Sequence, residues 1–329
     1  MTTSGRKYVR IALSYGVAGV CLFWVFHDIQ PHALAAAMAH IRWWLWILCV
    51  GLQFLAYFLV ACEWQFLLRP TGRLPLKRAT QAVFAGRFAN DVLPLQMGYL
   101  VRCVLAARWM NASVVSIFPS LIVERRWDGM WLAVGIGLIA SLLPLPPDVL
   151  RAGKLFGAMV LAGTAVTVLV VLRRKDIGAG RASPMDSPMK TIQRIRMTFG
   201  ILTGGVRDIA DSGLLVPILV LSFLKLGVQA AAFLGFLQAY HLHLPVLAGA
   251  AVFLAGYLGT CVPSTPAGTG TFQLFVVAAL VVFGVNKSIA AGFALLAFVS
   301  ITVPLASAGF FALAQSGLQL KELRDQKRF

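Results

Sequence analysis

The sequence predicts an all-α polytopic membrane protein, and three observations carry this prediction. The 329 residues are 59% hydrophobic and only 12% charged, whereas soluble domains carry about 25% charged residues. Apolar runs of about 20 residues, long enough to cross a bilayer as helices, recur along the chain. Two polar segments that break helices, at residues 87–102 and 263–273, interrupt these runs. We therefore expect about six full spans plus two re-entrant helical hairpins, or seven to eight spans.

The first half-repeat of this single transmembrane domain is expected at residues 43–143. Trp43, Trp44 and Trp46 open its first span as an aromatic interface anchor. The two pieces of its broken pair are each too short to cross a membrane, and prolines after Leu143 end its last helix. Together with a preceding span, the predicted helices are 8–26, 43–68, 79–88, 93–106 and 113–143.

The second half-repeat is expected at residues 214–316, after a change in composition. Residues 173–196 are rich in Arg and Lys and contain Pro184 and Pro188, which predicts a flexible cytoplasmic loop at the midpoint. A short amphipathic helix is expected at 191–211, and residues 317–329 form a charged cytoplasmic tail. The predicted spans and half-helices of this part are 155–172, 214–240, 246–262, 270–283 and 289–313.

The distribution of charge indicates orientation, location and partners. Lys and Arg gather at the N-terminus, at 69–78, at 173–196 and in the tail, so these segments are expected in the cytoplasm. We expect a multi-pass protein of the bacterial inner membrane with both termini cytoplasmic. The formal charge of +17 lies at the ends of apolar runs rather than on a soluble face. This pattern favours anionic membrane lipids as partners and excludes nucleic acid.

With this orientation, the two broken pairs enter the membrane from opposite faces. The first begins and ends on cytoplasmic stretches, and the second begins after His243 and returns near Asn286 on the outer side. Broken backbone at membrane depth needs protein or water around it, and one break in each half is typical of inverted-repeat transporters. The competing interpretation makes 246–262 and 270–283 two thin full spans, which the charge distribution also allows.

The first break carries candidate substrate-binding residues. Pro94 and Gly98 allow the chain to turn and its backbone to approach other groups closely. The side chains that could bind a polar group at membrane depth are those of Arg87, Asn90, Asp91 and Arg102. The competing interpretation is a simple cytoplasmic loop in which the two arginines extend to the interface as anchors.

A cluster of charges inside an apolar helix supplies further candidates. Glu124 and Asp128 are four residues apart and share one helix face, while Arg125 lies three residues before Asp128 and can pair with it. Charges within a membrane are costly and indicate function, and arginine suits phosphate because it donates two parallel hydrogen bonds. The alternative is a structural ion pair near the interface, with Arg126 as a helix anchor.

The second break joins two half-helices. The prolines and glycines that break it are Pro263, Pro266, Gly268 and Gly270. Ser264 and Thr265 supply hydroxyls, and the free N–H groups at the start of the next helix would attract an anionic headgroup. Lys225 and Gln229, one turn apart in the preceding span, either line the same cavity or extend the lysine to the interface.

Neither break carries a recognisable catalytic, metal or cofactor motif. A P-loop is excluded because no G-K-[ST] follows the glycines, and there is no nucleophile elbow. The five cysteines and five histidines match no metal-ligand spacing. We therefore expect no cofactor, no metal and no catalytic residue.

Three motifs in order give the chain a resemblance to the transmembrane domain of the lysylphosphatidylglycerol synthases, a family of flippase-like membrane proteins. The resemblance covers about residues 8–316, and its second pattern, E-R-x-x-D, fits Glu124, Arg125 and Asp128. The first pattern, N-x-x-x-P-x-x-x-G-E-x-x-R, is matched at Asn90, Pro94, Gly98 and Arg102, with Tyr99 replacing the glutamate. The third, P-x-x-P-G-G-x-G-x-x-E, is matched at Pro263, Pro266, Gly268 and Gly270, with Ala267 and Gln273 replacing a glycine and the glutamate.

The resemblance implies a lipid-handling domain that moves lipids between leaflets. Because the chain ends soon after its last span, we expect it to lack the soluble aminoacyl-transfer domain and not to make lysyl-lipid itself. The leading hypothesis is a translocase for an anionic, phosphate-bearing lipid. The alternatives are an accessory subunit that partners a separate enzyme of lipid biosynthesis, and a membrane-embedded transferase. The lipid, the direction, the coupling ion and the oligomeric state stay open.

Overall fold

The prediction of an all-α membrane protein is confirmed in the part of the chain that the structure describes. The computed structural model describes residues 40–93, 97–143, 213–261 and 266–317, with parts of 16–27 and 151–163 and residue 209. All regular secondary structure in these ranges is helical. The predicted helices at 8–26, 155–172 and 191–211, the loop at 173–196 and the charged tail lie mostly or wholly outside them.

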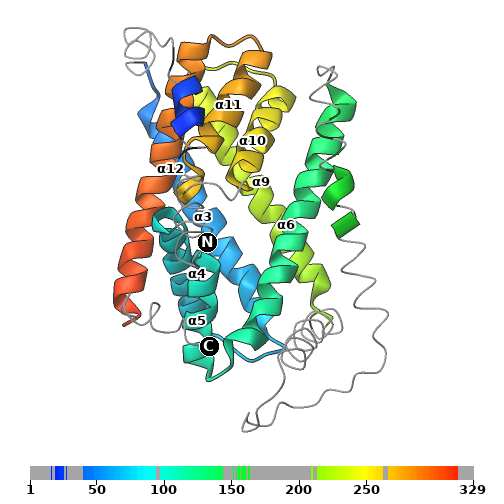
Figure 1. Cartoon of the computed structure of the whole chain (residues 1–329), viewed down its shortest axis with the longest axis vertical. Helices are drawn as coiled ribbons and strands as arrows, with labels where there is room; N and C mark the ends of the chain where they lie inside the picture. The colour runs from blue at the N-terminus through cyan, green and yellow to red at the C-terminus, as the bar shows by residue number, and fades with distance from the viewer. Residues whose placement is uncertain are drawn as a thin grey trace, which may run out of the picture.

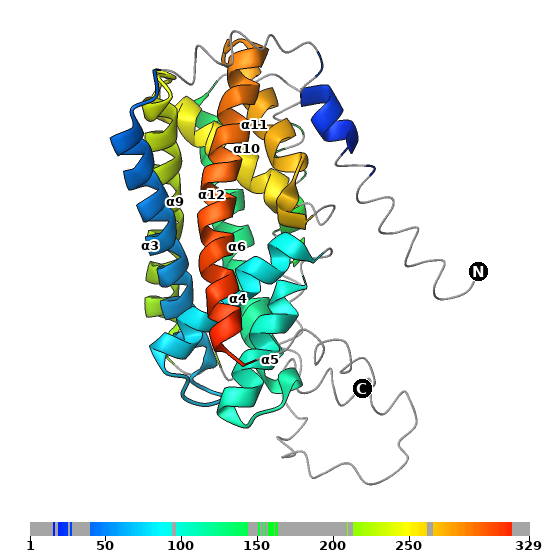
Figure 2. The same cartoon turned by 90° about the vertical axis from the view of Figure 1, so that its left-hand side faces the viewer.

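Three of the described helices are long and apolar enough to cross a membrane. They are α3 (Trp43–Leu68), α9 (Leu215–Ala239) and α12 (Lys287–Gln315). Helices α3 and α9 pack along each other, and α12 runs beside them through the length of the bundle (Figure 2). Helix α6 (Val114–Leu142) has 29 residues, as many as α12, but four charged residues near its middle lower its hydropathy.

Two pairs of short helices complete the described bundle, one at each end (Figure 1). Helices α4 (Leu76–Val92) and α5 (Gly98–Met110) form one pair, and α10 (Val246–Cys261) and α11 (Thr271–Val282) form the other. None exceeds 17 residues, whereas a transmembrane helix needs about 20. The turn η2 (Pro266–Gly268) joins the second pair and contacts α4 of the first. The broken ends of the two pairs therefore meet inside the bundle.

The boundaries of the first pair differ from the sequence prediction of 79–88 and 93–106. Pro75, with extended backbone, starts α4 three residues earlier than expected. The helix then continues through Asn90 and Asp91, so these polar residues belong to its last turn rather than to the break. The side chain of Asn90 accepts a hydrogen bond of 2.7 Å from the N–H of Gly98. This bond ties the end of α4 to the start of α5 and satisfies a backbone group that lipid could not.

The apolar core is divided into two clusters along the bundle. One contains Trp46 of α3 with Phe236 and Phe293, and the other contains Trp64 of α3 with Leu105. Helices α3, α6, α9 and α12 each contribute to both clusters. In α6 and α9, the buried Glu124 and Lys225 lie between the two contributions, and in α3 the buried Glu63 lies between Ala61 and Trp64 of the second cluster. These ionisable residues form a polar layer in the apolar core. This polar layer positions the candidate site.

Glycines allow the backbones of each short pair to approach closely. A Cβ atom added to Gly98 would collide with the carbonyl oxygen of Gly86 in α4. A Cβ added to Gly259 of α10 would lie 2.7 Å from the carbonyl oxygen of Thr271 in α11. Because backbone atoms cannot move aside as a flexible side chain can, alanine at either position would force the two helices apart.

Gly98→Ala is expected to lower the free energy of unfolding by about 1–3 kcal/mol, the usual cost of overpacking. Thermal unfolding in detergent, followed by circular dichroism, would measure the change. Gly227→Ala in α9 is the matched control, since no atom of the described residues lies within 4 Å of its added Cβ. Alanine is the better helix former, so this control should be neutral or slightly stabilising. Equal effects of the two substitutions would contradict the close contact.

Candidate functional site

A cavity of about 150 Å³ lies in the polar layer, where the broken ends of the two helix pairs meet. Residues from α3, α4, α5, α6, α9, α10 and η2 line it. The structure brings together here seven side chains named as candidates from sequence: Arg87, Asn90, Asp91, Arg102, Glu124, Arg125 and Asp128. The candidates Ser264 and Thr265, and the breaks Pro94 and Pro263, lie outside the described residues.

Arg102 and Glu124 form a buried, bidentate ion pair on one wall of the cavity. Nη1 and Nη2 of Arg102 donate to Oε1 and Oε2 of Glu124, each at 2.9 Å. Each side chain is 5% exposed. The guanidinium also lies 4.3 Å from the ring of Trp64, whose indole N–H donates to Ser120. The ion pair links α5 to α6, and the contact with Trp64 adds α3. Each of the two charges is neutralised by the other. Arg102 is therefore a structural arginine in this conformation and does not extend to an interface.

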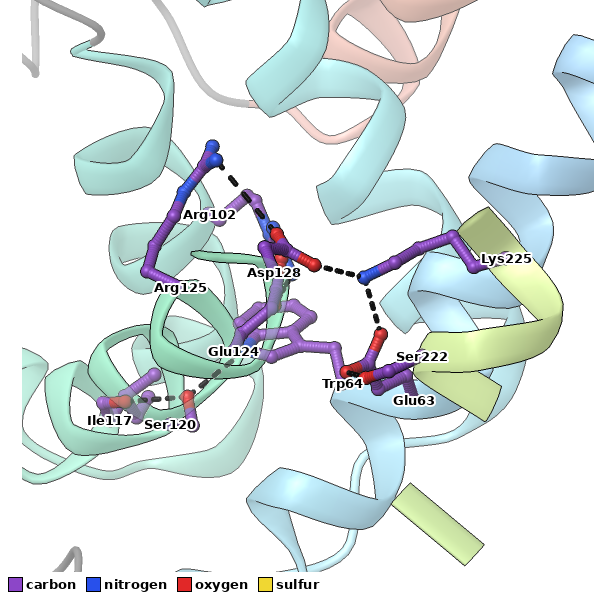
Figure 3. A network of polar contacts seen from close by, with 10 residues as sticks. All are labelled: Glu63, Trp64, Arg102, Ile117, Ser120, Glu124, Arg125, Asp128, Ser222 and Lys225. Atoms are coloured by element: carbon purple, nitrogen blue, oxygen red, sulfur yellow. Dashed lines mark hydrogen bonds and ion pairs between the residues drawn. The ribbon is translucent and has the colours of Figure 1, made fainter. Parts of the chain in front are cut away.

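Lys225 joins two carboxylates from different helices (Figure 3). Its ammonium donates to Glu63 of α3 at 2.7 Å and to Asp128 of α6 at 2.6 Å. The hydroxyl of Ser222 donates to the other oxygen of Glu63. Lys225 and Gln229 thus both line the cavity, and Lys225 does not extend to the interface. The ion pairs hold α3, α6 and α9 together at the level of the cavity.

Sequence reasoning missed Glu63, although its side chain is fully buried beside the cavity. The available signal was simple: Glu63 is the one acidic residue in the predicted span 43–68. An ionisable residue inside a membrane helix indicates a functional or paired position. Because it stands alone in its segment, its partner Lys225 could be found only from the three-dimensional arrangement.

Arg125 is the most available cation of the cavity. Its side chain is 43% exposed and its guanidinium lies 4.1 Å from the ring of Tyr99. The predicted contact with Asp128 is present, but the closest N···O distance of 3.8 Å is too long for a hydrogen bond. Tyr99, which stands where the family pattern has glutamate, thus supplies a ring under Arg125 instead of a carboxylate. Arg125 can donate to a ligand without first breaking a strong bond.

Arg87 and Asp91 form a second pair, one turn apart on α4. Their closest N···O distance is 3.2 Å, and the carboxylate is 6% exposed. Neither oxygen of Asp91 accepts a hydrogen bond of good geometry from the described residues. The guanidinium of Arg87 also lies 5.7 Å from the ring of Tyr57. This pair is weaker in geometry than the bidentate pair of Arg102.

The tip of the second pair is shaped by left-handed backbone. Ala267, Gly268 and Gly270 have φ of 58°, 72° and 87°. Glycine adopts these values without strain, and so the family pattern has glycine at position 267, where this chain has alanine. The side chain of Gln273 accepts a hydrogen bond of 2.7 Å from the N–H of Gly270. The residue that replaces the second family glutamate therefore closes this tip and does not reach into the cavity.

The charges at and directly behind the cavity balance within the described part of the chain. The cations are Arg87, Arg102, Arg125 and Lys225, and the carboxylates are Glu63, Asp91, Glu124 and Asp128. No three His, Cys, Asp or Glu side chains among the described residues are grouped to hold a metal ion. Arg125 is the one loosely held cation among the described residues of the cavity, so the arrangement can bind a polar headgroup through Arg125 and by hydrogen bonds.

Comparison with known proteins connects this geometry to a family. The family model for the lysylphosphatidylglycerol synthase TM region matches residues 11–309. None of the curated proteins matches the chain. The matched range includes every described helix that lines the cavity, together with most of α12.

Arg102→Met is expected to lower the free energy of unfolding by about 3–5 kcal/mol, because it leaves the buried Glu124 carboxylate unpaired. The double variant Arg102→Met/Glu124→Met should recover most of this loss, since an apolar pair carries no desolvation cost. Unfolding in a denaturing detergent titration would measure both.

Arg126→Met is the matched control, since this neighbouring arginine is exposed and does not line the cavity. Surface substitutions usually change stability by less than about 0.5 kcal/mol. A double variant as unstable as Arg102→Met alone would show that the ion pair is not the source of the effect.

Proposed function

Because the chain belongs to the lysylphosphatidylglycerol synthase transmembrane-region family, we propose that it moves an anionic, phosphate-bearing lipid between the leaflets of the inner membrane. The family links the chain to lipid metabolism in a membrane. The observation that carries the more specific proposal is Arg125, a half-exposed guanidinium at a polar cavity in the middle of the bundle. A lipid headgroup is the anion that a membrane supplies to such a site.

Arg125 is proposed to bind the phosphate. Its guanidinium can offer two parallel N–H groups to phosphate oxygens, and the ring of Tyr99 holds its plane in place. Arg87 is the second candidate, because its contact with Asp91 is a single one. We assign Asn90, Ser264 and Thr265 to hydrogen bonding with the rest of the headgroup, although Asn90 must then share its side chain with Gly98. Glu124 and Asp128 contribute by holding Arg102 and Lys225.

We further propose that the described helices form two inverted repeats. Helices α3, α4, α5 and α6 have 26, 17, 13 and 29 residues, and α9, α10, α11 and α12 have 25, 16, 12 and 29. Helix α4 packs against α12, and α10 packs against α6, so each short pair contacts the long helix of the other half. The short pairs also lie at opposite ends of the bundle (Figure 1).

In a membrane, these short pairs would be re-entrant hairpins that enter from opposite faces. The basic loop at 69–78 favours the cytoplasmic face for α4 and α5, and the weakly basic 241–245 favours the outer face for α10 and α11. The cavity at their tips would then lie near the midplane, where transporters of inverted-repeat design bind their substrates.

Cysteine labelling tests this topology in a variant whose five natural cysteines are replaced by alanine. Thr71→Cys and Asn111→Cys should react with a membrane-impermeant maleimide from the cytoplasmic side only, and His241→Cys from the outer side only. Ala267→Cys separates re-entry from two thin spans. A re-entrant tip is shielded from a bulky reagent on both sides, whereas two full spans would bring residue 267 to the cytoplasmic surface, which would contradict the hairpin.

Lipid movement in proteoliposomes tests the function itself. Fluorescent phosphatidylglycerol should change leaflets in the presence of wild-type protein. Arg125→Ala should slow this movement at least tenfold, since hydrogen bonds to charged groups contribute about 1.5–3 kcal/mol. Arg126→Ala is the matched control and should retain the wild-type rate, because Arg126 does not line the cavity.

Two outcomes would contradict parts of this proposal. Movement unaffected by Arg125→Ala would remove Arg125 from the binding site. Well-folded wild-type protein that moves no anionic lipid would contradict the translocase, and co-purification with an enzyme of lipid biosynthesis would then support an accessory subunit.

A further inference from the structure

We propose that binding of a lipid phosphate at Arg125 is coupled to the uptake of one proton by the pair of carboxylates that share Lys225. This inference rests on the proposed function and adds a coupling ion to it. The proton-binding site consists of Glu63 on α3 and Asp128 on α6, on either side of the Lys225 ammonium (Figure 3).

The two carboxylates occupy different positions relative to the cavity. Glu63 is fully buried and has two partners, the ammonium of Lys225 and the hydroxyl of Ser222. Asp128 lines the cavity and faces two cations, Lys225 at 2.6 Å and Arg125 at 3.8 Å. Asp128 therefore connects the buried cluster to the arginine that is available for a ligand.

The net charge of this cluster differs with and without a ligand. In the described structure, the charges of Arg125 and Lys225 offset those of Glu63 and Asp128. A phosphate that binds Arg125 neutralises the positive charge of that arginine. Lys225 is then the one cation left to two buried carboxylates, and the cluster carries one uncompensated negative charge. Burying an unpaired charge costs several kcal/mol in proteins, so uptake of a proton becomes favourable.

No neighbouring group among the described residues can supply the missing positive charge. On α5 and α6, Arg102 and Glu124 neutralise each other in a bidentate pair. On α4, Arg87 is paired with Asp91. Tyr257 and Cys261 of α10, which also face Asp128, carry no positive charge. The charged groups packed around the cluster therefore leave its balance to Arg125 and Lys225.

A proton fits the space between the two carboxylates better than a metal cation does. The ammonium of Lys225 already occupies the position between the two carboxylates, at 2.6 and 2.7 Å from their oxygens. A proton needs no additional space, and a protonated Glu63 would have the hydroxyl of Ser222 as an acceptor. The proton is shared by a coupled pair, so it belongs to Glu63 and Asp128 together rather than to one of them.

Coupling of this kind would give the translocase a driving force. One phosphate and one proton enter the site together, and both leave when the cavity opens to the other leaflet. Because linkage is reciprocal, a lower pH on one side favours lipid binding from that side. A proton gradient across the inner membrane would then drive the lipid in the same direction as the proton.

The direct test is to count the protons taken up when the purified protein binds a short-chain phosphatidylglycerol in weakly buffered detergent solution. Wild-type protein should take up about one proton per lipid bound, and its affinity should fall by up to about tenfold for each unit of rising pH. Glu63→Gln and Asp128→Asn should each reduce the uptake below about 0.2 proton per lipid bound. The reason is that Lys225 neutralises the one carboxylate that remains in the cluster. Both amides still accept from the lysine, so each variant can retain the fold.

Arg126→Gln is the matched control, since it removes an exposed charge of the same helix that does not line the cavity. It should keep the wild-type proton uptake. Binding without proton uptake by the wild type, or uptake that persists in both Glu63→Gln and Asp128→Asn, would overturn the coupling.

A second measurement separates this inference from the proposed function. In proteoliposomes, a pH gradient should accelerate lipid movement by the wild type. The rate of lipid movement by Glu63→Gln and by Asp128→Asn should not change with the gradient. Lipid movement that is equally fast with and without the gradient would overturn the coupling and leave the translocase intact. If phosphatidylglycerol neither binds nor moves, both proposals fail.

Discussion

A charge buried in the middle of a membrane bundle must be paired, because neither lipid nor an apolar core can replace the water that it has lost. The arrangement of the described helices follows from this requirement at one level of the bundle. Lys225 bridges Glu63 and Asp128, and Arg102 forms an ion pair with Glu124. These contacts fix α3, α5, α6 and α9 relative to one another between two apolar clusters. Rotation of one of these helices would leave a buried charge without its partner and would also disrupt the packing.

The same requirement applies to the backbone at the two breaks. A free N–H group inside the bundle is also poorly tolerated, because it costs several kcal/mol without a hydrogen-bond partner. The amide of Asn90 accepts from Gly98, and the amide of Gln273 accepts from Gly270. Glycines then allow the paired helices to approach at Gly86 and Gly259. Short side chains and amide caps therefore make it possible for broken helices to meet where the cavity lies.

Much of the fold could be predicted from the sequence, because apolar length is a local property. The predicted span 43–68 coincides with α3, and the predicted half-helices 246–262 and 270–283 differ from α10 and α11 by one residue at most at each end. The first break was placed too early because Asn90 and Asp91 look like loop residues, whereas one of them caps a distant backbone group. Pairing between helices is not local, and for this reason Glu63 was missed.

The balance of charge at the cavity also bears on how the proposed anionic lipid would be selected. The net charge of +17 lies entirely outside the cavity, since the four cations and four carboxylates there cancel. The basic excess can attract anionic lipids to the membrane surface, but it does not decide what enters the bundle. A neutral cavity attracts little from a distance. Selection must therefore act at short range, through whichever group can replace Asp128 as the partner of Arg125.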